Sequence, residues 1–262
     1  MRRVVPAVLV VLLTAVTVAS DAPRARRAPP PQSVPPGGNS QYDGRFLIAR
    51  LKYVFGFGGF YYRGIPAWQH GYPQSEQNLL QIAREITLLR PSPEASKVLA
   101  IDDPELFHYP VSYMVEAGYW EMTDKEAVAL RAYLLKGGFL ILDDSRDGFS
   151  PGNMGWANIA GNFARVFPEL HWIDLSPSHP IFHAFFDINS FDVVKNYYDR
   201  GPPVFRALFV DNDPTRHMLV MSNFNTDVSN YWEFSANGFT PVDESNQAYE
   251  LGVNYLVYAL TH

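Results

Sequence analysis

The chain contains no cysteine among its 262 residues. Without cysteine it can form neither a disulfide framework nor the lipid-modified cysteine of a lipoprotein. Any attachment to a membrane would therefore have to run through an uncleaved signal segment.

Basic side chains are scarce beyond the amino-terminal region. The first forty residues hold five Arg and one Asp, which leaves 16 basic against 26 acidic side chains in residues 41–262. Phosphate binding requires a basic surface. We therefore predict no nucleic-acid partner.

A membrane-spanning apolar run is also lacking. Residues 4–18 are apolar over about 15 positions, follow two Arg, and precede Ala19 and Ser20; spanning a bilayer takes roughly 20 residues. This pattern is typical of a signal peptide over residues 1–20, with a short signal anchor as the alternative. Residues 21–40 are rich in Pro and predict a linker. We expect an exported protein, periplasmic or secreted.

The remaining residues 41–262 predict one domain in which strands alternate with helices. A capping box at Thr123 and Glu126 begins the most clearly marked helix, which ends at Gly137. This order predicts an α/β fold with a mostly parallel sheet and helices on both faces. The predicted strands are 45–53, 97–101, 111–115, 139–142, 170–175, 204–210 and 217–222, and the other predicted helices are 78–89, 156–166 and 247–260.

Two aspartates follow the apolar strand 139–142 directly. Ligands bind at the carboxyl ends of strands in open α/β sheets, so Asp143, Asp144 and the adjacent Ser145 are candidate ligand-binding residues. A carboxylate pair could bind a divalent cation, hydrogen-bond a sugar or share a proton for catalysis. The alternative is that one caps a turn and the other is solvated.

Asp102 and Asp103 end another predicted strand. If both strands are parallel, their four carboxylates open on one sheet edge, which would favour a hard cation. Asp103 precedes Pro104 and equally fits a helix N-cap. The candidate metal ligands are therefore Asp102, Asp143 and Asp144, and no other cofactor is identified.

Residues 53–68 combine glycines with many aromatics. Phe57, Tyr61 and Tyr62 could stack on a sugar ring or contact a partner protein. The glycine spacing does not match a dinucleotide-binding fingerprint. Burial of the rings against the sheet edge is the alternative.

The chain resembles the DUF4159 family of the class I glutamine amidotransferase-like superfamily, in the segments RFLIARLKY, QNLL, YPVSYM, LRAYLLKGGFLILDDS, VFPE, SHPIF and LGVNYLVYAL. The resemblance implies an α/β, flavodoxin-like three-layer sandwich with a mostly parallel sheet. It is more distantly similar to trehalose-utilisation (ThuA-like) proteins, through GGFLIL and the His179–Pro180 pair. The superfamily's enzymes carry a nucleophilic Cys after the strand that 139–142 resembles. The missing Cys excludes that chemistry.

The resemblance adds four candidates. The superfamily supplies a His from a later loop, and His179 lies in the corresponding region. Tyr113 lies in a matching segment, and Asn223 and Asp227 belong to a late polar segment that matches the family.

Two functions remain open at this point. The first is a non-catalytic binding module of the cell envelope, whose partner would be an envelope protein or a carbohydrate-like ligand. The alternative is a carboxylate- or metal-assisted hydrolase of a glycan or related envelope substrate, with Asp143, Asp144 and His179 as candidate catalytic residues.

Overall fold

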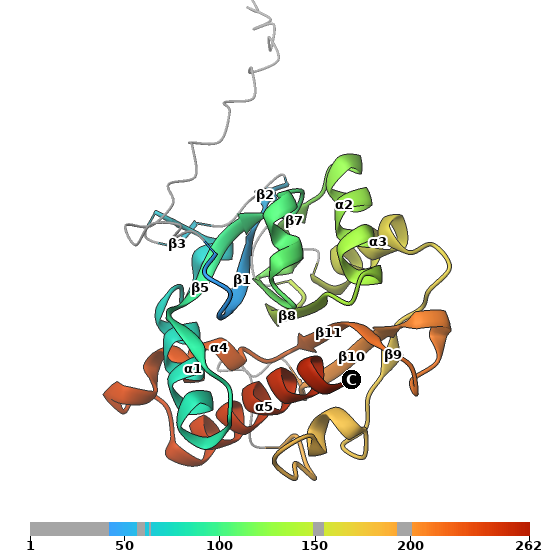
Figure 1. The fold of residues 1–262 in the computed structure, drawn as a ribbon. Coiled ribbons are helices and arrows are strands. Elements are labelled where there is room, and N and C mark those ends of the chain that lie inside the picture. The colour runs from blue at the N-terminus through green and yellow to red at the C-terminus, as the bar shows by residue number, and fades with distance from the viewer. Residues whose placement is uncertain (1–41, 57–60, 63, 149–154, 193–200) are drawn as a thin grey trace, which may run out of the picture. The chain divides into compact units, whose positions relative to one another are not determined.

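A seven-stranded sheet forms the centre of the domain, in the order β5-β1-β6-β8-β11-β10-β9. The computed structural model describes residues 42–56, 61–62, 64–148, 155–192 and 201–262 (Figure 1). The predicted signal peptide and linker lie outside these residues. The strands of the sheet are β1 Phe46–Lys52, β5 Pro91–Ala100, β6 Val111–Val115, β8 Phe139–Ser145, β9 Ile173–Asp174, β10 Val204–Phe209 and β11 Met218–Phe224.

Five neighbouring strands, β5, β1, β6, β8 and β11, are parallel, and β10 runs antiparallel to both β11 and β9. The chain goes from β1 to β5 on one side and then to β6 on the other. This reversal is the topological switch point of flavodoxin-like sheets, where a crevice opens at the carboxyl ends of the strands. The predicted fold class is confirmed.

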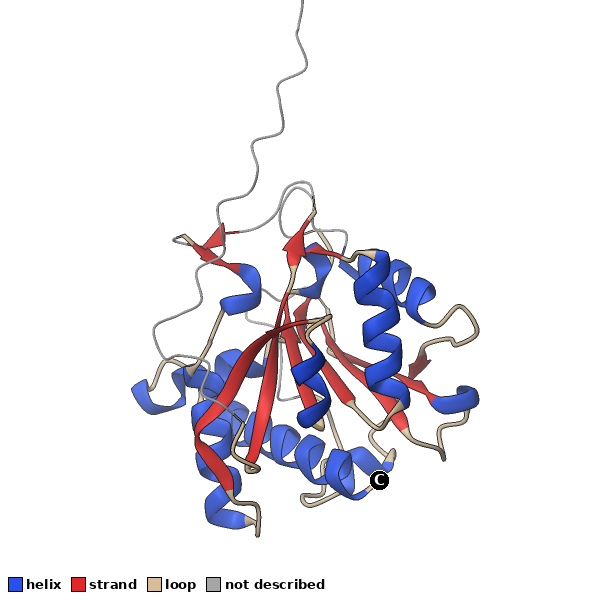
Figure 2. Cartoon of the chain, turned by 45° about the horizontal axis from the view of Figure 1, so that its top comes forward, coloured by secondary structure: helices blue, strands red, loops and turns tan. Residues whose placement is uncertain are grey.

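Helices cover both faces of the sheet. In Figure 1, α2 and α3 lie on one face, and α1, α4 and α5 lie on the other; Figure 2 shows the same three layers by type of element. The helices are α1 Gln74–Ile86, α2 Asp124–Leu135, α3 Gly155–Val166, α4 Val228–Phe234 and α5 Val242–Thr261. Two short ribbons complete the described strands: β2 Val54–Phe55 with β7 Trp120–Glu121, and β3 Tyr61–Tyr62 with β4 Ile65–Pro66.

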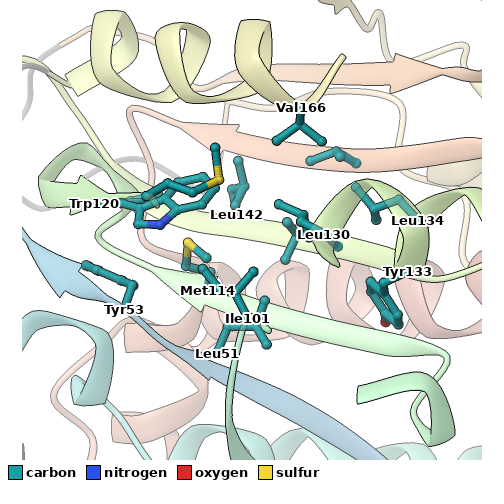
Figure 3. Close-up of a cluster of buried hydrophobic side chains, with 14 of the residues drawn as sticks. Leu51, Tyr53, Ile101, Met114, Trp120, Leu130, Tyr133, Leu134, Leu142 and Val166 are labelled. Atoms are coloured by element: carbon teal, nitrogen blue, oxygen red, sulfur yellow. The ribbon is translucent and has the colours of Figure 1, made fainter. Parts of the chain in front are cut away.

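Strand β8 contributes side chains to both hydrophobic cores because successive side chains of a strand point to opposite faces. Leu140 and Leu142 belong to the core under α2 and α3, whereas Phe139 and Ile141 belong to the core under α1, α4 and α5. Figure 3 shows the first core, in which Leu142 lies among side chains from β1, β6 and α2. The whole strand is buried, as its apolar sequence predicts.

Several element boundaries differ from the predictions. Strand β8 extends to Ser145 rather than 142, so Asp143 and Asp144 lie inside it, and helix α5 begins at Val242 rather than 247. Strand β5 begins at Pro91 rather than Lys97; it is an edge strand, where a missing N–H is tolerated. Helix α1 spans Gln74–Ile86 rather than 78–89. Strand β9 keeps only Ile173–Asp174 of the predicted 170–175.

Several local predictions are confirmed. The capping box of Thr123 and Glu126 begins α2, and Asp103 accepts a hydrogen bond from the N–H of Glu105 at a helix N-terminus with Pro104 in its first turn. In the described part of the chain, no helix combines the length and the apolar character needed to cross a membrane.

Candidate functional site

Two acidic residues with left-handed backbones lie at the switch point. Glu116 follows β6 directly with φ 55°, and Asp144 lies near the end of β8 with φ 51°. Non-glycine residues rarely adopt this conformation, and such strain concentrates at functional sites. A short 3-10 helix, Ala117–Tyr119, follows Glu116 at once. Glu116 is therefore the residue at which the chain turns from β6 into this helix.

These two carboxyl groups meet a histidine from a third loop. His70 Nδ1 lies 3.3 Å from Glu116 Oε1, and Glu116 is hydrogen-bonded to Asp144. One donor atom from each of these three residues lies within 4.8 Å of the other two. We call His70, Glu116 and Asp144 the switch-point cluster. His70 lies in the connection between β1 and α1, Glu116 follows β6, and Asp144 lies near the end of β8. The parallel order of β1, β6 and β8 brings them together.

Hydrogen bonds to the residue after β1 and to β8 hold the backbone of Glu116. Tyr53, the residue after β1, donates its hydroxyl to the carbonyls of Val115 and Glu116 at 2.9 and 2.7 Å. The N–H of Glu116 donates to the carbonyl of Asp143 at 3.0 Å. The carboxyl of Glu116 is therefore carried by a turn that is fixed from both neighbouring strands.

Negative charge exceeds positive charge around the switch-point cluster. Arg146 forms an ion pair with Asp144 and is itself buried. Burial raises the pKa of Glu116 to about 7, against an ordinary 4.5. Burial and the Glu116 charge raise the pKa of Asp144 well above its usual range, and burial with the Asp144 charge does the same to the pKa of Asp227. Protons or a cation must therefore balance the remaining carboxyl groups.

The imidazole of His70 is uncharged at neutral pH. Burial and the nearby Arg50 charge lower the pKa of His70 to about 4. A neutral imidazole is the form that ligates metals and accepts protons. His70 precedes Gly71, whose φ of 70° lies in the left-handed region that glycine adopts without strain.

Asp143 lies on the other side of β8 and belongs to a different network. Its carboxyl accepts from the hydroxyl of Tyr113 at 2.6 Å, from Asn223 Nδ2 at 3.0 Å, and from the N–H groups of Val228 and Ser229 at 3.3 and 2.9 Å. Burial raises the pKa of Asp143, whereas these hydrogen bonds lower it. Asp143 therefore links the start of α4 to β8 through hydrogen bonds.

The predicted ligand-binding residues around Asp143 divide between the two networks. Tyr113 and Asn223 contact Asp143, and Ser145 donates its hydroxyl to the Asp143 carbonyl at 3.4 Å. Asp227 caps α4 by accepting from the N–H of Asn230 at 3.0 Å. Its interaction with the charges of Asp144 and Arg146 shows that it also borders the switch-point cluster.

The structure does not bring His179 to these residues. Its ring lies near Phe209 and Tyr258, with centroid separations of 5.6 and 6.0 Å. Phe209 pairs with Met218, the first residue of β11, so His179 lies at the amino-terminal edge of the parallel strands. Asp144 lies at the opposite edge.

Asp102 is engaged elsewhere as well. Its carboxyl forms an ion pair with Lys125 Nζ at 2.7 Å, and Asp103 serves as a helix cap. Neither belongs to the group of close donor atoms that contains Asp144.

The aromatic segment 53–68 is only partly described. Its ends are buried: Tyr53 is 2 % exposed and Trp68 is 0 % exposed. Phe57 lies outside the described residues, and for Tyr61 and Tyr62 the structure gives the backbone of β3 alone. Stacking of these rings on a ligand stays a prediction.

Sequence reasoning missed His70, Glu116 and Arg146. Glu116 carries the same signal as Asp143 and Asp144, a charged residue directly after a buried apolar strand, and could have been found by it. His70 follows no spacing rule. Only the topology of the sheet brings the loop after β1 beside the turn after β6.

The donor set of the switch-point cluster suits a divalent cation. One imidazole and two carboxylates are ligands of Zn²⁺ and Mn²⁺ sites, and the imidazole disfavours Ca²⁺ and Mg²⁺. Ligands about 2.0–2.2 Å from an ion lie roughly 3–4 Å apart. The donor atoms already lie within 4.8 Å of one another. Small side-chain rotations would therefore bring them to the separation that ligands of one metal ion have.

A family model described as a domain of unknown function (DUF4159) matches residues 48–260. The matched range runs from β1 into α5 and includes every member of the switch-point cluster. No curated protein matches the chain.

Proposed function

Since the chain belongs to the DUF4159 family, whose description states no activity, we propose that this domain is a metal-assisted hydrolase whose centre is the switch-point cluster. One observation carries the proposal: His70, Glu116 and Asp144 place donor atoms within 4.8 Å of one another at the carboxyl edge of the sheet.

The electrostatics support this choice over a purely structural cluster. Buried carboxyl groups that share one arginine are costly unless protons or a cation compensate them. A divalent cation would compete with the protons that burial favours on Glu116 and Asp144, and it would supply a polarised water for hydrolysis.

The remaining residues would have distinct roles. Arg146 would hold Asp144 in place and offer positive charge to an anionic intermediate. The aromatic segment 53–68 supports a glycan or related envelope substrate.

We also propose that the protein is exported and that it is related to a known superfamily. The signal-like residues 1–20 and the Pro-rich residues 21–40 support export to the periplasm or beyond. The flavodoxin-like order of strands supports a link with the glutamine amidotransferase-like superfamily, without the Cys chemistry of its enzymes.

A non-catalytic binding module of the envelope is the second candidate. The ion pair between Arg146 and Asp144 favours it, because an arginine already balances one of the charges that a metal would balance. In that case an envelope protein or a carbohydrate-like ligand would bind without turnover.

Calorimetric titration of the full chain with Zn²⁺, Mn²⁺, Mg²⁺ and Ca²⁺ separates the candidates. We expect one ion of the first two to bind at a 1:1 ratio. Glu116→Gln or Asp144→Asn should weaken binding by at least about 100-fold, since loss of a ligand costs more than loss of its supporting residue. Asp102→Asn is the matched control, because it removes a carboxylate that pairs with Lys125.

Hydrolysis of chromogenic glycosides and esters, with and without a chelator, then tests turnover. Chelator-sensitive turnover that is lost in Asp144→Asn supports the hydrolase. Metal binding without turnover on any substrate favours the binding module. Absence of metal binding by the unsubstituted protein contradicts the proposed function.

A further inference from the structure

Arg50 lies in the middle of β1, beside the switch point, and its guanidinium is fully enclosed by protein. Its side chain is 0 % exposed. Its backbone pairs with Val98 of β5 on one side and with Tyr113 of β6 on the other. The side chain therefore extends from a strand position that is paired on both sides.

The guanidinium joins helix α1 to the loop that carries His70. Arg50 Nε donates to Glu76 Oε1 at 2.6 Å, and Nη2 donates to Ser75 Oγ at 3.3 Å. Nη1 donates to the carbonyls of Trp68 and His70 at 3.1 and 3.2 Å. One planar group thus satisfies two carbonyls at the end of the 3-10 helix Ala67–Gln69 and one buried carboxylate.

We propose that Arg50 is a positioning residue, which holds the His70 loop so that the imidazole faces Glu116. This inference rests on the proposed function, because it assigns Arg50 a role in building the switch-point cluster. A fixed backbone carbonyl on His70 limits the positions that its ring can reach. Supporting groups of this kind set the affinity of metal sites.

Substitution can separate a positioning role of Arg50 from a purely stabilising role of its ion pair with Glu76. Replacing both partners of a buried ion pair by apolar residues of similar size is often neutral for stability. The double variant Arg50→Met, Glu76→Met therefore removes the anchor of the loop and leaves no uncompensated charge. The carbonyls of Trp68 and His70 lose their donor, so the melting temperature should fall while the variant stays folded, which circular dichroism checks.

The test compares this double variant with a matched pair elsewhere. Arg131 likewise bridges a glutamate and a backbone carbonyl, since it donates to Glu169 Oε1 at 2.6 Å and to the Val166 carbonyl at 2.8 Å. Arg131→Met, Glu169→Met removes that arrangement near the amino-terminal end of β11, where the Glu169 carbonyl accepts a hydrogen bond from Asn212 in the connection between β10 and β11. Both double variants are made in the full chain.

Two measurements are made on each protein: calorimetric affinity for Zn²⁺ and Mn²⁺, and hydrogen exchange of the peptide covering residues 65–73. For the Arg50 and Glu76 double variant we expect about 10- to 100-fold weaker binding and faster exchange in residues 65–73. The Arg131 and Glu169 control should change neither.

Unchanged exchange in residues 65–73 of the folded Arg50 and Glu76 variant overturns the inference, as does an unchanged affinity. If the unsubstituted protein binds no metal, the proposed function fails, while the exchange measurement still decides the role of Arg50. If the double variant does not fold, Arg50→Lys takes its place. It keeps the charge beside Glu76 and loses the planar fork, and we expect the same two changes.

Discussion

Asp143 and Asp144 are neighbours in the chain and are both buried, yet their carboxyl groups belong to different parts of the molecule. Asp143 faces α4 and accepts four hydrogen bonds, from Tyr113, Asn223 and two backbone N–H groups. Asp144 lies beside Glu116 and Arg146 at the switch point.

The comparison shows how one signal in the sequence can mark two roles. An aspartate after a buried strand is expected at a ligand site, but the carboxyl of Asp143 is fully used by hydrogen bonds to protein. The carboxyl of Asp144 lies instead beside the charged side chains of Glu116 and Arg146. We therefore assign a structural role to Asp143 and a functional role to Asp144.

The largest expected effect is that of Asp143→Ala on stability. The substitution leaves the hydroxyl of Tyr113, the amide of Asn223 and two N–H groups without an acceptor inside the protein, so we expect a loss of about 3–5 kcal/mol. Urea unfolding at pH 7 measures it. Asp174→Ala, which removes an exposed carboxylate, is the control and should cost below about 1 kcal/mol. A loss of similar size in both variants would contradict the structural role.

The next effect is the pH dependence of stability in the presence of a chelator. The folded protein holds a proton on Glu116 up to a pKa of about 7, whereas the unfolded chain releases it near 4.5. Between these values the unfolded state binds fewer protons, so stability falls as pH rises. The contribution of Glu116 should reach about 3 kcal/mol.

Glu116→Gln isolates that contribution. The variant should lose stability less steeply than the unsubstituted protein between about pH 4.5 and 7 and should be the more stable of the two at pH 8. Asp144 and Asp227 titrate in the same direction and remain in both proteins. Parallel stability curves for the two proteins would show that Glu116 is not held in its protonated form.

Tyr113→Phe tests the hydrogen-bond network of Asp143 without changing the switch-point cluster. It removes the 2.6 Å hydrogen bond to Asp143 and keeps the ring that packs beside Arg50. We expect a loss of about 1–2 kcal/mol in urea unfolding and an affinity for Zn²⁺ within about threefold of the original. A loss of metal binding as large as that in Asp144→Asn would mean that the two networks act as one.

The smallest expected effect is that of Asp144→Asn on stability. Burial raises the pKa of Asp144, which lowers the cost of replacing its carboxyl by an uncharged amide, and the amide oxygen of Asn can still accept a hydrogen bond from Arg146. The free energy of unfolding should therefore change by about 1 kcal/mol. Urea unfolding with a chelator present measures it, beside Asp143→Ala. A loss equal to that of Asp143→Ala would assign Asp144 a structural role as well.

Much of the fold follows from local patterns in the sequence. The capping box at Thr123, the buried run that becomes β8 and the turn between β10 and β11 each specify an element through short-range chemistry. Element ends were harder to predict. The start of β5 at Pro91 depends on its place at the edge of the sheet, which no local pattern reveals.

The candidate site could be predicted only in part. The rule for strand ends located Asp144, and applied to Val111–Val115 it would also have located Glu116. It could not separate Asp143 from Asp144, because that difference depends on which face of β8 each side chain takes. His70 could not be found, since its distance from Glu116 depends on the order of strands in the sheet.

The most direct test of the central claim is a crystal structure of the full chain soaked with Mn²⁺ or Zn²⁺, with anomalous difference density collected at the absorption edge of the metal. We predict one peak bounded by His70 Nδ1 and the carboxylates of Glu116 and Asp144, at about 2.0–2.2 Å from each. A peak at Asp143, or an ordered cluster with no peak at metal concentrations that saturate calorimetry, would contradict the account.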